Sequence, residues 1–213
     1  MADNYLEKRY EETLGNGKIR VKRIGHTLDD LLAKSRSHRG YLKAYAVSRA
    51  ELERIVGVCS KLPSGCNQQV LRYYLVTRDS GADKVLPLIK MGAALPELHL
   101  PLPGTEPEAF IFCCSAAKES KLVDIDLGIA LQSMALKAVE MGLNTLMIGA
   151  FNHEKLKEAF DLPSEPLMLL AVGKGTDRIE LVPTDEDSPR AYYRKEGIHY
   201  VPKVRAKDLI INK

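Results

Sequence analysis

The chain has 213 residues, of which 45% are apolar and 28% charged, and its formal net charge is +3. These values are typical of a globular protein and exclude a disordered tail or a collagen-like fibre. The charge is also smaller than that of a dedicated nucleic-acid binder. The length predicts one domain over residues 1–213.

The sequence shows neither a membrane segment nor an export signal. Its longest apolar run, Pro166 to Val172, is far shorter than the roughly 20 residues of a membrane helix. The N-terminus is polar, without the apolar stretch of a signal peptide, so we expect a cytoplasmic protein. The four cysteines form no C-x-x-C pair, which favours reduced thiols.

The first third of the chain contains two helix-start signals. Residues 1–26 are polar and predict an N-terminal arm. Thr27 can cap a helix that reaches Lys34. Ser48 and Glu51 form a capping box, and the helix that they begin must end before Pro63.

The middle of the chain alternates short elements with loops. We expect a strand at Tyr73–Val76, a short helix at Ala82–Lys90, a loop at Leu95–Pro107 and a buried strand at Ala109–Cys114.

The longest helical pattern covers Asp124–Met141 and is apolar on nearly all sides. A helix of this kind is buried on most of its surface. In so short a chain, this indicates that a second subunit covers one face, and we expect Met134 and Ala138 in the core of a homodimer.

The last part of the chain predicts a strand at Thr145–Ile148, a helix from Asn152 to Phe160 and a buried strand at Leu167–Val172. The tail from Pro183 to Lys213 has no obvious local partner. Within it, Tyr200–Arg205 suits either an edge strand or an arm that wraps another subunit. This mixture of elements, not in strict βαβ order, favours the α+β class.

Several familiar motifs are missing. There is no Walker A motif, and Gly173-Lys174-Gly175 lacks the third glycine of a dinucleotide-binding turn. The histidines and cysteines have no metal-ligand spacing, and no serine-hydrolase turn occurs. The sequence therefore predicts no metal site and no side-chain nucleophile, and disfavours hydrolytic chemistry.

Two basic clusters could bind a phosphate group. Arg36 and Arg39 flank Ser37 and would share a face if the first helix continued through them, and guanidinium groups match phosphate oxygens. Lys203 and Arg205 point the same way in an extended segment. Each cluster alone also fits a solvated basic surface.

Two turns carry groups that could contact a ligand. Pro63, Ser64 and Asn67 lie in a loop between a helix and a strand, where a hydroxyl and an amide could bond the edge of a heterocycle. Gly149 and Ala150 lie between a strand and a helix, where backbone N–H groups can face a ligand. Taken by itself, the first is better explained as an ordinary loop, and the second also fits a tight strand-to-helix turn.

Taken together and in order, these features resemble the FMN-dependent nitroreductase family. The resemblance spans about Thr27 to Arg205. It rests on Ser35-Arg36-Ser37-His38-Arg39, on Pro63-Ser64-x-x-Asn67-x-Gln69, on the helix end Gln132 to Leu143, on Ile148 to Phe151 and on the pair Lys203 and Arg205. Ser35 stands where the family usually has its first arginine.

The resemblance implies a mostly antiparallel sheet flanked by helices and an intertwined homodimer with FMN at the subunit interface. The arm of residues 183–213 would embrace the partner subunit. It implies that Arg36, Ser37, Arg39, Lys203 and Arg205 hold the phosphate and ribityl end. Pro63, Ser64 and Asn67 would lie along the isoalloxazine, and Gly149 and Ala150 near its N5 and O4 edge.

The implied activity is ping-pong hydride transfer from NAD(P)H, through flavin N5, to a small-molecule acceptor such as a nitroaromatic or a quinone. Flavin reduction and reductive dehalogenation are alternatives on the same scaffold. A non-catalytic FMN-binding protein would need the same basic clusters. A nucleic-acid module is the weakest alternative, because the basic clusters are not interleaved with aromatic residues.

Overall fold

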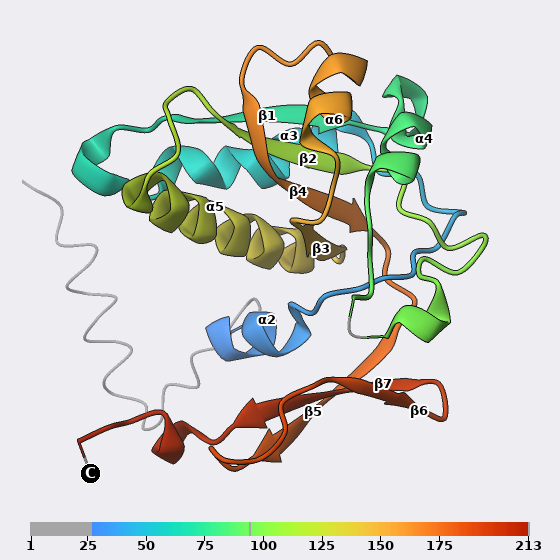
Figure 1. Cartoon of the computed structure of the whole chain (residues 1–213), viewed down its shortest axis with the longest axis vertical. Helices are drawn as coiled ribbons and strands as arrows, with labels where there is room; N and C mark the ends of the chain where they lie inside the picture. The colour runs from blue at the N-terminus through green and yellow to red at the C-terminus, as the bar shows by residue number, and fades with distance from the viewer. Residues whose placement is uncertain (1–26, 94, 213) are drawn as a thin grey trace, which may run out of the picture.

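The computed structural model describes residues 27–93 and 95–212, so the predicted arm at 1–26 lies outside the described residues. A four-stranded antiparallel sheet with the order β1-β2-β4-β3 forms the centre of the protein (Figure 1). Its strands are β1 (Leu71–Val76), β2 (Phe110–Ser115), β3 (Asn144–Ile148) and β4 (Glu165–Gly173). All four overlap predicted strands, and the α+β class is confirmed.

The α-helices in the described ranges are α2 (Leu28–Lys34), α3 (Arg49–Val56), α4 (Ala82–Val85), α5 (Lys121–Glu140) and α6 (His153–Ala159). Both predicted N-caps are confirmed, since Thr27 and Ser48 each form a capping box with the residue three positions on. The helix predicted to reach Lys90 ends at Val85 and gives way to a 3-10 turn at Leu86–Leu88, because Pro87 has no N–H to donate.

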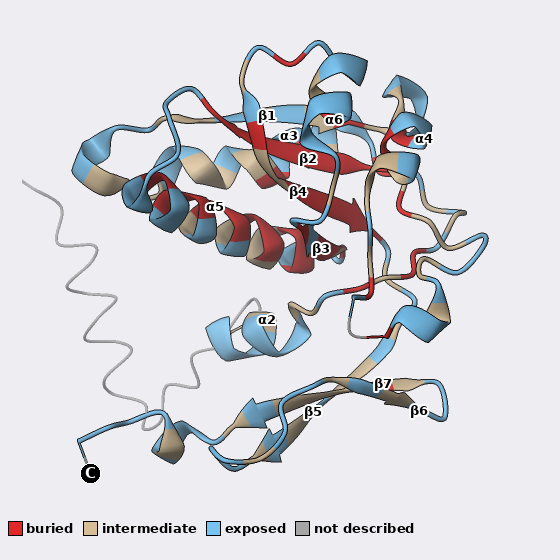
Figure 2. Ribbon diagram, in the orientation of Figure 1, coloured by how far each residue is buried: buried red, intermediate tan, exposed pale blue. Residues whose placement is uncertain are grey.

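The strand β2 lies at the centre of the core, and all six of its residues are buried. Its side chains alternate between two apolar clusters. Phe110 and Phe112 pack with the side of α4 and α6, whereas Ile111 and Cys113 pack with α3 and α5. The helices therefore cover both faces of the sheet (Figure 2).

The long helix α5 corrects one prediction. Met134 and Ala138 have no exposed surface and belong to the cluster that α5 forms with the chain's own sheet, so their placement in a dimer core is wrong. They lie on the stripe that faces β2. The opposite side of α5 carries apolar side chains that remain accessible, with Leu122 43% and Ile125 48% exposed.

A second, three-stranded sheet follows the main sheet in the chain and lies apart from it (Figure 1). It consists of β5 (Arg178–Thr184), β6 (Tyr193–Lys195) and β7 (Ile198–Val204) in the order β5-β7-β6. The interpretation of Tyr200–Arg205 as an edge strand fits most of this segment, because β6 pairs with β7 only up to Tyr200 and residues 201–204 pair with β5 alone. The tail does pair within the chain, since β7 pairs with the nearby β6 in antiparallel and with the more distant β5 in parallel.

No helix in the described ranges is long and apolar enough to cross a membrane. The four cysteines are free, and Cys113 and Cys114 are buried in the main sheet, where burial raises the pKa of both thiols.

Candidate functional site

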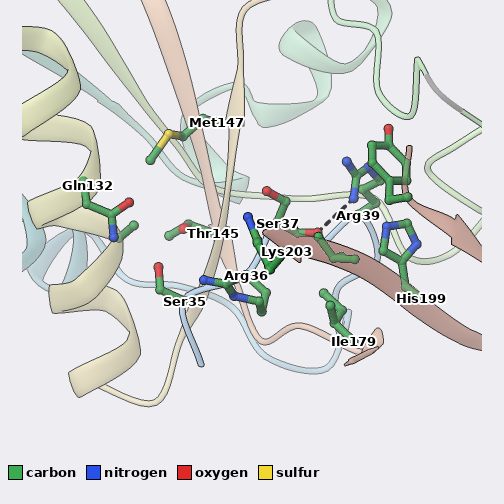
Figure 3. Close-up of a pocket in the computed structure, with 13 residues that line it drawn as sticks. Ser35, Arg36, Ser37, Arg39, Gln132, Thr145, Met147, Ile179, His199 and Lys203 are labelled. Carbon is green, nitrogen blue, oxygen red and sulfur yellow. Dashed lines mark hydrogen bonds between the residues drawn. The ribbon is translucent and has the colours of Figure 1, made fainter. Parts of the chain in front are cut away.

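A pocket of about 300 Å³ brings together residues from α5, β3 and the second sheet, and we call it the basic pocket (Figure 3). It contains four of the predicted site residues, Arg36, Ser37, Arg39 and Lys203. The other lining residues are Ser35, Gln132, Ala135, Thr145, Met147, Ile179, Tyr192, His199 and Val201.

Residues Ser35–Arg39, which we call the arginine segment, reach this pocket as extended chain and not as a helix. The helix α2 ends at Lys34, and Ser37 then pairs with Thr145 alongside β3. The main-chain N–H of His38 donates to the carbonyl oxygen of Thr145 at 3.1 Å. The predicted helix end at Lys34 is confirmed, so Arg36 and Arg39 do not share a helical face, although both side chains do line one pocket.

Asp177 holds the C-terminal end of the arginine segment in place. Its Oδ2 accepts hydrogen bonds from the main-chain N–H groups of Arg39 at 2.6 Å and Gly40 at 3.0 Å. Because this carboxylate accepts from main-chain donors, it fixes the path of the backbone at Arg39 and Gly40. Lys203 lines the same pocket from β7. The chain thereby positions cations that are more than 160 residues apart around one cavity.

The electrostatics of the basic pocket favour an anion. Its lining contains three permanent cations, Arg36, Arg39 and Lys203, and no acidic residue. The Nε atoms of both arginines are buried without a hydrogen-bond acceptor. Burial also lowers the pKa of Arg36, since desolvation disfavours the charged guanidinium. A buried donor without a partner is costly, and an anion beside either guanidinium would supply the missing acceptor.

Two histidines next to the arginines add little positive charge at neutral pH. Burial lowers the pKa of both His38 and His199. Arg39 lowers both values further, whereas the nearby Asp177 carboxylate opposes the change. His199 packs against the ring of Tyr192, and the Arg39 guanidinium lies 4.8 Å from the centre of the same ring.

The other predicted site residues lie elsewhere in the single chain. Arg205 lies outside the basic pocket and forms an ion pair with Asp185. Pro63 and Ser64 line a second pocket of about 340 Å³ beside α5. Asn67 has a positive φ of 53° and accepts a hydrogen bond from the side chain of Gln69.

The Ser64 hydroxyl is already engaged within the chain. It donates to Asp126 on α5 at 2.8 Å and accepts from the main-chain N–H of Gln69 at 2.9 Å. The other Asp126 oxygen accepts from the N–H of Gly65 at 2.9 Å. Asp126 thus ties this loop to the helix, so Ser64 shapes the loop in the single chain.

Gly149 and Ala150 follow the end of β3, and the strand itself connects them to the basic pocket. Successive side chains of a strand point to opposite faces, so Thr145, Met147 and Gly149 share one side. The first two line the basic pocket. This side of β3 is therefore a continuous path from the cations to the Gly149–Ala150 turn. Ala150 also lines a third pocket of about 490 Å³.

Sequence reasoning missed several residues of the site. The alternation of side chains along β3 predicts that Thr145 and Met147 share one face. The same alternation along β7 predicts that His199 shares a face with Lys203. Asp126 had a different signal, a carboxylate within the apolar face of a helix. Within the part of the chain that the structure covers, no three His, Cys, Asp or Glu residues are grouped to hold a metal ion.

Comparisons with known proteins show what this chain is similar to. The family model "Nitroreductase family" matches residues 32–174. YdgI, a Bacillus subtilis protein named as an NAD(P)H nitroreductase, is 24% identical over 184 residues, which cover 70% of this chain and 88% of YdgI.

Solved structures share the fold. A nitroreductase family protein from Clostridium difficile has a TM-score of 0.57 at 24% identity and covers 71% of this chain and 86% of its own. A nitroreductase-named protein from Exiguobacterium sibiricum, solved in complex with FMN, has a TM-score of 0.58 at 21% identity, with 72% and 90% covered. Because the matched residues hold the main sheet, its helices and the arginine segment, this chain belongs to the nitroreductase family.

Proposed function

We propose that the protein is an FMN-dependent oxidoreductase that uses NAD(P)H to reduce a small acceptor, such as a nitroaromatic or a quinone. The observation that carries the proposal is the basic pocket, in which two buried arginine Nε atoms have no acceptor and no acid lines the wall. These donors fit a phosphate group, since arginine forms paired hydrogen bonds with phosphate oxygens.

The FMN phosphate would be held by Arg36, Ser37 and Lys203, with Arg39 beside it. Lys203 lies on β7, beyond the residues that the family model matches. The second sheet therefore completes a site that the matched segment begins. The polar side chains of Gln132 and Thr145 in the same pocket suit the ribityl hydroxyls.

The isoalloxazine would follow the open side of β3 from Met147 to Gly149 and Ala150. The chemistry that FMN supplies is the transfer of a hydride and electrons between NAD(P)H and an acceptor. The chain's own contribution is to hold the phosphate, to orient the ring along the strand and to leave one side of it open to substrate. No side-chain nucleophile is needed for this chemistry.

A second copy of the chain would complete the site. Pro63, Ser64 and Asn67 lie near the N-terminal half of α5, whereas the basic pocket lies against Gln132 and Ala135 further along the same helix. If two α5 helices packed antiparallel through their exposed apolar sides, the loop of one protomer would lie beside the basic pocket of the other. We therefore retain the homodimer, with the tail as its embracing arm, as part of the proposal.

The test is the visible absorption spectrum of the purified protein, with FMN added if the protein is colourless. We expect a yellow protein, and we expect Arg36→Ala or Arg39→Ala to weaken FMN binding by about tenfold or more, because hydrogen bonds to charged groups contribute ~1.5–3 kcal/mol each. Arg178→Ala removes an exposed arginine from β5 outside the pocket and should bind FMN normally.

Unchanged FMN affinity in both pocket variants would refute the phosphate assignment. Arg205→Ala tests the remaining basic residue that was predicted to hold the phosphate. Arg205 must break its ion pair with Asp185 in order to reach a ligand. Oxidation of NAD(P)H in the presence of an added acceptor then separates an enzyme from a non-catalytic FMN-binding protein.

A further inference from the structure

The third pocket, of about 490 Å³, is framed by two segments that are distant in the chain. Ile89 and Phe151 form an antiparallel bridge. The main-chain N–H of Lys90 donates to the carbonyl of Ala150 at 2.8 Å, and that of Asn152 donates to the carbonyl of Leu88 at 2.9 Å. These hydrogen bonds fix the rim of the cavity to the turn that follows β3.

The residues beside the bridge differ in exposure. Ile89 and Phe151 are partly buried and pack against the core cluster of the main sheet. Lys90 and Ala150, which flank them, are exposed and line the cavity. Lys155, on the first turn of α6, lines the same cavity.

The lining of this cavity is cationic. Its residues are Pro87, Leu88, Ile89, Lys90, Ala150, Phe151, Asn152 and Lys155, which include two lysines and no acid. Two other lysines near the main sheet, Lys43 and Lys157, form ion pairs with glutamates. The cavity shares no lining residue with the basic pocket, so a phosphate bound in the basic pocket leaves Lys90 and Lys155 available.

We propose that the Lys90–Lys155 pocket binds the anionic group, a phosphate or a carboxylate, of the molecule that exchanges electrons with the flavin. The inference rests on the proposed function, which puts Ala150 at the reacting edge of the ring. A ligand that contacts the reacting edge of the ring and extends past Ala150 would reach the ammonium groups of Lys90 and Lys155. The charge would come either from the 2′-phosphate of NADPH or from an acidic acceptor.

The experiment uses the FMN-loaded protein and two matched pairs of substrates. The first pair, NADPH and NADH, differs by one phosphate and is compared in the reduction of bound flavin. The second pair, para-nitrobenzoate and para-nitrobenzamide, differs by one charge. It is compared in steady-state reduction and in titrations that follow the absorbance of oxidised bound flavin. Lys90→Gln and Lys155→Gln are measured beside Lys84→Gln, which removes an exposed lysine of α4 outside the cavity.

In each pocket variant, we expect the preference for the charged member of one substrate pair to fall about three- to tenfold, as is typical when a partly exposed charge contact is removed. Lys84→Gln should retain the preference, and added salt should reduce it in the wild type. A change in the NADPH and NADH pair identifies the coenzyme as the source of the charge, and a change in the nitrobenzoate pair identifies the acceptor.

Three results would overturn the inference. One is an unchanged preference in both pairs for both variants, with FMN fully bound, which leaves the proposed function intact. Another is loss of FMN from both variants, because the lysines would then hold the cofactor. The third is a wild type that takes up no FMN, which removes the proposed function as well.

Discussion

Gly173 and Gly175 show how single residues shape the arginine segment. A Cβ atom on Gly175 would lie 2.1 Å from Nδ1 of His38, and one on Gly173 would lie 2.6 Å from the ring of Tyr41. The glycines therefore let residues 38–41 pack directly against the end of β4. The motif that looked like part of a dinucleotide-binding turn has a packing role, which helps to position Arg36 and Arg39.

Gly175→Ala should destabilise the protein and weaken FMN binding. The added methyl group must push His38 away, and overpacking of this kind costs about 1–3 kcal/mol in the free energy of unfolding. Urea unfolding measures this change, and an FMN titration measures the effect on the pocket. Gly57→Ala is the control, because no atom lies within 4 Å of its added Cβ. Equal stability of the two variants would contradict the packing role.

At the scale of elements, the loop that contains Pro63 and Ser64 is held to α5 by one carboxylate. Asp126 is only 7% exposed and accepts hydrogen bonds from Ser64 and Gly65. The loop also contains Cys66, Asn67 and Gln69 in positive-φ conformations, which are unusual for residues other than glycine. Such a backbone persists only where contacts maintain it, and Asp126 provides them.

Asp126→Ala should therefore cost about 1–3 kcal/mol in the free energy of unfolding, because the donors of Ser64 and Gly65 lose their acceptor. Asp124→Ala, which removes an exposed carboxylate from the first turn of the same helix, should cost less than about 1 kcal/mol, through loss of a weaker interaction with the helix dipole. Thermal melts of both variants measure the difference. A stability loss at Asp126 no larger than at Asp124 would show that the carboxylate does not hold the loop.

Elements with local signals were predictable and those with distant partners were not. Thr27 and Ser48 each form a capping box whose members are three residues apart, so the helix starts at α2 and α3 could be read directly. The strand β7 depends instead on pairing with β5, some 20 residues earlier. This distant partner, unlike the nearby β6, could not be read from short-range alternation.

For the whole molecule, the apolar side of α5 is a surface that the single chain leaves partly uncovered. Leu122 and Ile125 are exposed, and Ile129 and Leu136 on the same side are partly exposed. Burial of such a surface is favourable, and exposed apolar patches mark interaction sites. A second copy on this side would also bring its Pro63–Asn67 loop to the basic pocket.

If the proposed dimer forms, Ile125→Asp should shift the protein toward monomer and weaken FMN binding, because a charge on an apolar interface resists desolvation. Leu102→Asp is the control, an apolar side chain 42% exposed in a loop away from α5. Size-exclusion chromatography with light scattering measures the mass, and absorbance measures bound FMN. A stable, flavin-loaded dimer of the Ile125 variant would contradict this interface.

The sequence by itself determined the α+β class, most helices and strands of the main sheet and the identity of the basic residues. These depend on local periodicity, caps and residue chemistry, which act over a few positions. Only the tertiary structure decided that Arg36, Ser37 and Arg39 share a pocket with Lys203 while Arg205 pairs with Asp185. Only the fold showed that Met134 and Ala138 face the chain's own sheet. Both outcomes depend on which surfaces meet when distant segments pack, and that packing is set by the whole chain.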